Sequence, residues 1–142
     1  MTAPIPLLLL TGYLGAGKTT TLNHLLRLPY VREQDVALII NEFGQLGVDG
    51  QLVDAGHRPV YELNKGSLFC ICIKTDFLKT LREIAAEPRP DLVIVEATGI
   101  AEPRDLEDFV DEPALANAFA IQANVCLVDA AGFIQVAPML QA

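Results

Sequence analysis

A glycine-rich segment directly after an apolar run most constrains the fold of this 142-residue chain. The apolar run Ile5–Leu10 is typical of a buried strand, and it leads into Gly12-Tyr13-Leu14-Gly15-Ala16-Gly17-Lys18-Thr19. The residues that follow, 18–26, are predicted to form a helix. A strand, a glycine loop and a helix in this order can surround a phosphate group with backbone N–H groups. The segment therefore predicts a nucleotide-binding loop.

Each part of this loop has its own expected role. The glycines allow positive φ angles and a close approach of the backbone to phosphate. Lys18 is expected to reach the β- and γ-phosphates, and Thr19 is expected to bind Mg²⁺ through its hydroxyl. The candidate nucleotide-binding residues are Gly12, Gly15, Ala16, Gly17, Lys18, Thr19 and Thr20.

Composition and charge limit the partners that the chain can have. A net charge of −8 leaves no basic surface for nucleic acid or for an anionic membrane. With 51% hydrophobic residues the chain can bury the core of one domain, yet no run reaches the ~20 apolar residues of a transmembrane helix. The three cysteines are an odd number without secretory features, which favours reduced thiols in the cytoplasm.

The rest of the sequence alternates between predicted strands and helices. Further buried strands are predicted at 35–40, 91–96 and 124–129, a short strand at 58–63, a loop at 64–74, and helices at 75–86 and 104–110. This order predicts an α/β fold of the P-loop NTPase type, a mostly parallel sheet with helices on both faces in three layers. The polar residues that end the strands should share one edge. Cys126 is expected to pack in the core, and His24 and His57 are expected to be structural or exposed.

Two further motifs contain candidate metal ligands. Glu96-Ala97-Thr98-Gly99 follows a predicted strand, where Glu96 would hold Mg²⁺ and the Gly99 amide would meet the γ-phosphate. The alternative is a carboxylate that ends a strand before a turn. Cys70 and Cys72 form a C-x-C pair in the predicted loop, where extended backbone would point both sulfurs to one side and let them bind Zn²⁺. The alternative is two inert buried thiols.

These motifs, together with Asn41-Glu42-Phe43-Gly44, occur in an order that resembles the CobW-like metallochaperone GTPases from about Leu7 to Phe133. The resemblance implies GTP and GDP as ligands, a catalytic role for Lys18, Thr19, Glu96 and Gly99, and delivery of zinc or cobalt to a client metalloprotein. It also implies a first switch at Asn41–Asp49, a second at Glu96–Pro103, and a homodimer as an expected assembly.

The sequence departs from the family pattern at two places. The family's metal motif has a third cysteine where this chain has Ile73, so Glu42 becomes a candidate oxygen ligand beside Cys70 and Cys72. No Asn-Lys-x-Asp sequence for guanine recognition follows Asp129. The resemblance therefore implies one GTPase domain over 1–142, incomplete at its C-terminal end and without the family's C-terminal domain.

Two other functions remain open from the residues alone. A phosphate loop does not select the base, so the chain could be a P-loop ATPase or kinase. It could also be a nucleotide-gated binding module without turnover.

Overall fold

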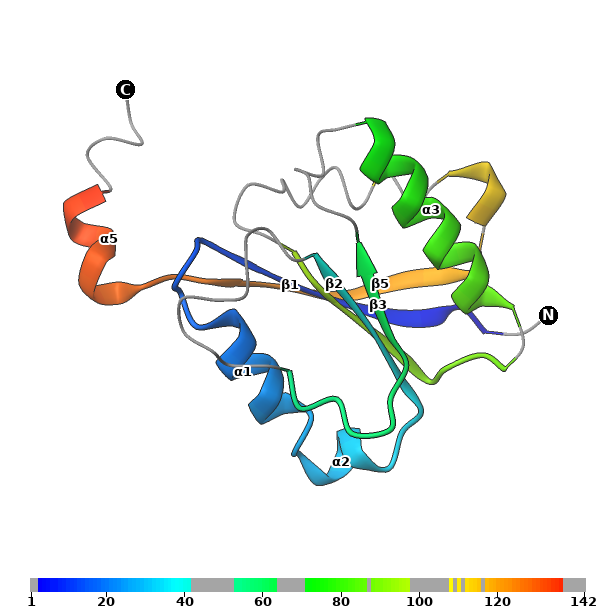
Figure 1. Ribbon diagram of the computed structural model, residues 1–142, viewed down its shortest axis with the longest axis horizontal. Helices are drawn as coiled ribbons and strands as arrows, with labels where there is room; N and C mark the ends of the chain where they lie inside the picture. The colour runs from blue at the N-terminus through cyan, green and yellow to red at the C-terminus, as the bar shows by residue number, and fades with distance from the viewer. Residues whose placement is uncertain are drawn as a thin grey trace.

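The computed structural model describes residues 3–41, 53–63, 71–86, 88–97, 108, 110, 112–115 and 117–136. Its centre is a five-stranded sheet in the order β3-β2-β4-β1-β5, and every neighbouring pair is parallel (Figure 1). The strands are β1 (Ile5–Gly12), β2 (Val36–Asn41), β3 (Val60–Leu63), β4 (Leu92–Glu96) and β5 (Phe119–Leu127).

Helices cover both faces of the sheet. The helical elements are α1 (Lys18–Leu25), α2 (Pro29–Arg32), α3 (Ile71–Ala85), the 3₁₀ helix η1 (Pro113–Leu115) and α5 (Ala130–Val136). In Figure 1, α1 and α2 lie below the sheet, α3 lies above it, and α5 extends away beyond the end of β5. The predicted three-layer α/β fold of the P-loop NTPase type is therefore confirmed.

The two faces of the sheet support two separate hydrophobic cores. Leu7 and Leu9 of β1 pack with Phe77 of α3 on one face. Leu10 of the same strand packs with Leu22 of α1 on the other face. Because successive strand residues point to opposite faces, a strand buried on both faces reads as a continuous apolar run. This explains why the central strands could be recognised in the sequence.

The structure corrects the predicted bounds of two elements. β5 begins at Phe119 and ends at Leu127, whereas the sequence predicted a strand at 124–129. The loop predicted at 64–74 is wrong in its last part, because α3 already begins at Ile71. Of the helix predicted at 104–110, only Asp108 and Val110 lie among the described residues, and both are helical.

Cys126 is exposed, so its predicted place in the core is wrong. Among the described elements β5 is an edge strand that pairs with β1 alone, and its side chains from Gln122 to Cys126 are all exposed. His24 and His57, which were expected to be either structural or exposed, are exposed. No helix within the described part of the chain is long and apolar enough to cross a membrane.

Candidate nucleotide-binding site

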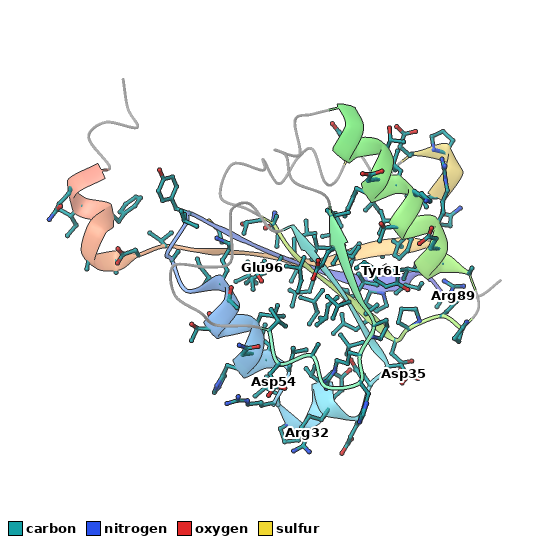
Figure 2. All side chains as sticks on the ribbon, viewed as in Figure 1. Arg32, Asp35, Asp54, Tyr61, Arg89 and Glu96 are labelled. Carbon is teal, nitrogen blue, oxygen red and sulfur yellow. The ribbon has the colours of Figure 1, made fainter. Side chains whose placement is uncertain are left out.

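The site lies where the carboxyl ends of β1, β4 and β5 meet. Leu10 of β1 is opposite Glu96 of β4, and Gly12 is opposite Leu127 of β5. Figure 2 shows Glu96 near this end of the sheet, while Asp35 and Arg89 lie toward the other end. In open parallel sheets, ligands bind outside the carboxyl ends of the strands. The first strand therefore delivers the glycine loop to the edge where a ligand is expected.

The three loop glycines have positive φ angles for two different reasons. Gly15 and Gly17 have φ values of 81° and 91°, and a Cβ on either would meet no atom within 4 Å. Gly12 has φ 135°, and a Cβ there would lie 2.4 Å from the carbonyl oxygen of Leu127. Gly15 and Gly17 thus leave open space beside the backbone, as a bound phosphate needs. Glycine at residue 12 is instead required because the backbone there passes close to that of Leu127 in β5.

Lys18 is folded back across the loop. Its ammonium donates to the carbonyl oxygens of Gly12 at 2.8 Å and Tyr13 at 3.1 Å, and the residue is only 8% exposed. The Tyr13 carbonyl also accepts the backbone N–H of Ala16 at 3.1 Å, which closes the turn. The side chain of Lys18 therefore lies across the loop, with its charge directed at backbone oxygens that phosphate oxygens could replace.

Thr19 and Glu96 are 77 residues apart and form a direct hydrogen bond. The Thr19 hydroxyl donates to Oε1 of Glu96 at 3.0 Å. A hydroxyl that donates one hydrogen bond keeps two lone pairs, and a carboxylate has further acceptor positions. Hydroxyl and carboxylate oxygens are ligands that Mg²⁺ prefers, so this pair fits such an ion. The predicted convergence of these two residues at one edge of the sheet is what the structure contains.

Burial sets the electrostatics of the site. It lowers the pKa of Lys18, and the nearby charge of Glu96 opposes that shift. Burial likewise raises the pKa of Glu96, and this shift is opposed by the hydrogen bond from Thr19 and by the charge of Lys18. Both charged side chains are thus held partly desolvated at one place, which is the condition under which fixed charges act most strongly on a ligand.

Of the remaining predicted site residues, Ala16 and Thr20 lie in the described part of the chain. Ala16 is half-buried in the loop and Thr20 is exposed in α1. Glu42, Cys70 and Gly99 lie outside the described residues, as do the two predicted switches apart from Asn41, Glu96 and Ala97. Their roles remain predictions.

The premise for the C-x-C pair is wrong at one of its two residues. Cys72 lies in the first turn of α3, so its backbone is helical and not extended. Among the residues that the structure describes, no three His, Cys, Asp or Glu side chains are grouped so that they could hold a metal ion.

Sequence reasoning missed one contact beside the site. The backbone N–H of Asp54 donates to Oδ1 of Asn23 in α1 at 2.8 Å, which ties together residues 31 apart. Only the position of Asn23, four residues after Thr19 and therefore on the same side of the helix, could have drawn attention to it.

This fold and this loop define the chain as a nucleotide-binding domain of the P-loop class. A sequence profile of the CobW/HypB/UreG nucleotide-binding domain matches residues 6–140. The chain therefore belongs to the CobW/HypB/UreG family.

Named relatives agree with this assignment. The chain is 35% identical over 138 residues to a protein of Pseudomonas aeruginosa named zinc chaperone CobW, with 89% of this chain and 36% of the relative covered. It is 31% identical over 121 residues to the zinc chaperone YeiR of Escherichia coli, covering 85% and 36%. It is 34% identical over 134 residues to zinc-regulated GTPase metalloprotein activator 1 of Schizosaccharomyces pombe, covering 89% and 32%. The chain thus spans about a third of the length of these relatives.

Proposed function

We propose that this chain is the nucleotide-binding part of a Mg²⁺-dependent GTPase that couples its nucleotide state to the binding or delivery of zinc or a similar transition metal. The observation that carries the proposal is the arrangement of three residues at the carboxyl ends of β1 and β4. Lys18 donates to the carbonyl of Gly12, and Thr19 donates to the carboxylate of Glu96. The names of the relatives, zinc chaperone and zinc-regulated GTPase, support the metal and the guanine nucleotide.

The residues of the loop perform three tasks in this proposal. The backbone N–H groups that follow Gly15 and Gly17 bind phosphate oxygens at the start of α1. Lys18 exchanges its two backbone carbonyl partners for phosphate oxygens, and its charge offsets the charge that develops on the transferred group. Thr19 and Glu96 would hold Mg²⁺, which would supply further positive charge to stabilise the phosphates.

The transition metal would be the cargo or the regulator of the protein. Cys70 and Cys72, with Glu42, remain the proposed ligands. We propose further that the protein works in the reducing cytoplasm, delivers its metal to a client metalloprotein and assembles as a homodimer. Guanine selectivity is proposed from the relatives and not from a residue in this chain.

Binding of a fluorescent GTP analogue with Mg²⁺ tests the nucleotide site. Lys18→Ala removes charge-assisted hydrogen bonds of about 1.5–3 kcal/mol and should weaken binding about tenfold to a hundredfold. Lys79→Ala is the matched control, because this lysine lies on α3 and forms an exposed ion pair with Glu83. Equal affinities of the two variants would contradict the proposed role of Lys18.

Three further measurements separate the alternative functions. Competition between GTP and ATP distinguishes a GTPase from an ATPase or kinase. Phosphate release, compared with that of Lys18→Ala, distinguishes an enzyme from a binding module. Titration of Zn²⁺ with and without GTP, and of GTP with and without Zn²⁺, tests the coupling, since both affinities must change by the same factor.

A further inference from the structure

The segment Val53–Arg58 lies against α1, the helix that starts in the phosphate loop. Asp54 donates its backbone N–H to the side-chain oxygen of Asn23 at 2.8 Å. On either side of this bond, Val53 and Ala55 pack on the hydrophobic core to which α1 also contributes. A backbone bond between two apolar contacts fixes the position of the segment along the helix. Figure 2 shows Asp54 beside the lower part of α1.

Arg58 attaches the other end of this segment to the same helix. Its Nη2 donates to the carbonyl oxygen of Leu26 at 3.4 Å, just past the end of α1, and its Nη1 donates to that of Ala55 at 3.3 Å. A cation at a helix C-terminus binds carbonyls that have no partner within the helix. The backbone N–H of Arg58 also donates to the carbonyl oxygen of Ala55 at 3.2 Å, so a backbone bond and a side-chain bond both close the turn from Ala55 to Arg58.

The segment connects elements that matter for the nucleotide site. Asn23 follows Thr19 by one helical turn, so both lie on one side of α1. After Arg58, the chain enters β3 through Pro59, whose carbonyl accepts the backbone N–H of Leu38 in β2 at 3.0 Å. Before Val53, the sequence contains the predicted first switch. A displacement of α1 at Thr19 would therefore act on a segment that is hydrogen-bonded to α1 and that continues through Pro59 into the sheet.

From these contacts we propose that Asn23 is a positioning residue that transmits the position of the phosphate-binding helix to the segment Val53–Arg58. Through this contact the protein distinguishes a nucleoside triphosphate from a diphosphate. The inference rests on the proposed function, because it needs a nucleotide at the loop. It adds a residue that touches neither the phosphates nor the metal.

The decisive measurement is the ratio of the dissociation constants for GDP and a non-hydrolysable GTP analogue, both with Mg²⁺. Asn23→Ala removes the acceptor and should move this ratio about threefold or more toward one. Asn23→Asp keeps an acceptor oxygen and should restore the wild-type ratio within about twofold. A residue that only stabilises the fold would lower the melting temperature without changing the ratio.

Arg27→Ala is the control that distinguishes the backbone bond from the side-chain pair at the same residue. Arg27 meets the Asp54 carboxylate at 3.6 Å, but the two side chains are 72% and 67% exposed. Such pairs contribute little, so the ratio should stay within about twofold of the wild type. An unchanged ratio in Asn23→Ala, or a wild-type ratio of one, would overturn the inference and leave the proposed function standing. A wild-type chain that binds neither nucleotide would overturn both.

Hydrogen exchange in the wild-type chain gives a second test that needs no variant, for the case that Asn23→Ala does not fold. Addition of the GTP analogue should slow exchange of the Asp54 amide more than addition of GDP does. The amide of Arg32, the last residue of α2, donates to the carbonyl oxygen of Leu28 at 2.9 Å and should respond equally to both nucleotides. Equal protection of Asp54 by the two nucleotides would refute the inference.

Discussion

Replacing Gly12 with alanine tests whether the loop glycines have the separate roles that their surroundings indicate. The new Cβ would lie 2.4 Å from the carbonyl oxygen of Leu127, 3.0 Å from its nitrogen and 3.1 Å from its carbonyl carbon. All three neighbours are backbone atoms of β5, and Gly12 is paired with Leu127 in the sheet. The contact therefore cannot be relieved by turning a side chain.

Two costs add at this position. An alanine with φ 135° occupies a strained backbone conformation, which costs about 1–3 kcal/mol. Overpacking against a neighbour that can move only with its strand costs about 1–3 kcal/mol more. The sum, about 2–6 kcal/mol, is a large share of the roughly 5–15 kcal/mol that stabilises an ordinary domain. Gly12→Ala should therefore lower the free energy of unfolding by several kcal/mol.

Gly15→Ala is the matched control in the same loop. Its φ of 81° is also positive, but a Cβ there meets no atom within 4 Å. Only the conformational cost of about 1–2 kcal/mol remains. Both variants should bind nucleotide less well, so binding does not separate them, whereas stability does.

Urea denaturation followed by circular dichroism, without nucleotide, measures this difference. The m-values must agree between variants for the free energies to be compared. We expect Gly12→Ala to be less stable than Gly15→Ala by at least about 1 kcal/mol. If the two variants lose the same free energy of unfolding, the contact with Leu127 does not set the requirement for glycine at residue 12.

Three other changes have defined expected outcomes. Burial raises the pKa of Glu96, so the stability that this residue contributes is present below its unfolded pKa and is lost as the pH rises through its folded pKa. Glu96→Gln should remove this loss, as measured by urea unfolding at several pH values, and should therefore raise the free energy of unfolding at neutral pH. The same variant should weaken Mg²⁺-dependent nucleotide binding. Thr19→Val leaves the buried carboxylate without its donor and should cost about 1–3 kcal/mol, whereas Thr19→Ser, which keeps the hydroxyl, should cost less in the same assay. Phe77→Ala removes a fully buried side chain of α3 and should cost about 3–5 kcal/mol in thermal or urea unfolding, against less than about 0.5 kcal/mol for Lys79→Ala.

The central part of the fold and of the site could be predicted because each depends on local pattern plus one rule of topology. The runs around Leu7, Leu38 and Ile94 are apolar on both faces, as strands buried on both faces of a parallel sheet must be. Once the strands are parallel, their carboxyl ends share an edge. The neighbourhood of Thr19 and Glu96 then follows from the sequence, although 77 residues separate them.

The errors arose where the local pattern favoured another structure or gave no signal. Cys70-Ile71-Cys72-Ile73 alternates as a strand or extended loop does, yet α3 begins at Ile71. The start of β5 was missed because the polar Gln122 interrupts the apolar residues Phe119-Ala120-Ile121, although these residues are less exposed than the part of the strand that the sequence predicted. Its extent is set by pairing with β1, from Ile5 opposite Phe119 to Gly12 opposite Leu127, and such pairing cannot be read from one segment alone.

The contribution of β5 to the site is made largely by its backbone. Leu127 limits residue 12 to glycine through its carbonyl group, and the hydroxyl of Thr11 donates to the carbonyl of Val125 at 3.4 Å. Side-chain substitutions at exposed positions of β5 leave these carbonyls in place, whereas a shift of the strand moves the point at which the phosphate loop leaves β1. The nucleotide site is therefore tied to the edge of the sheet through main-chain atoms, and an interaction that displaces β5 would alter nucleotide affinity without touching the loop.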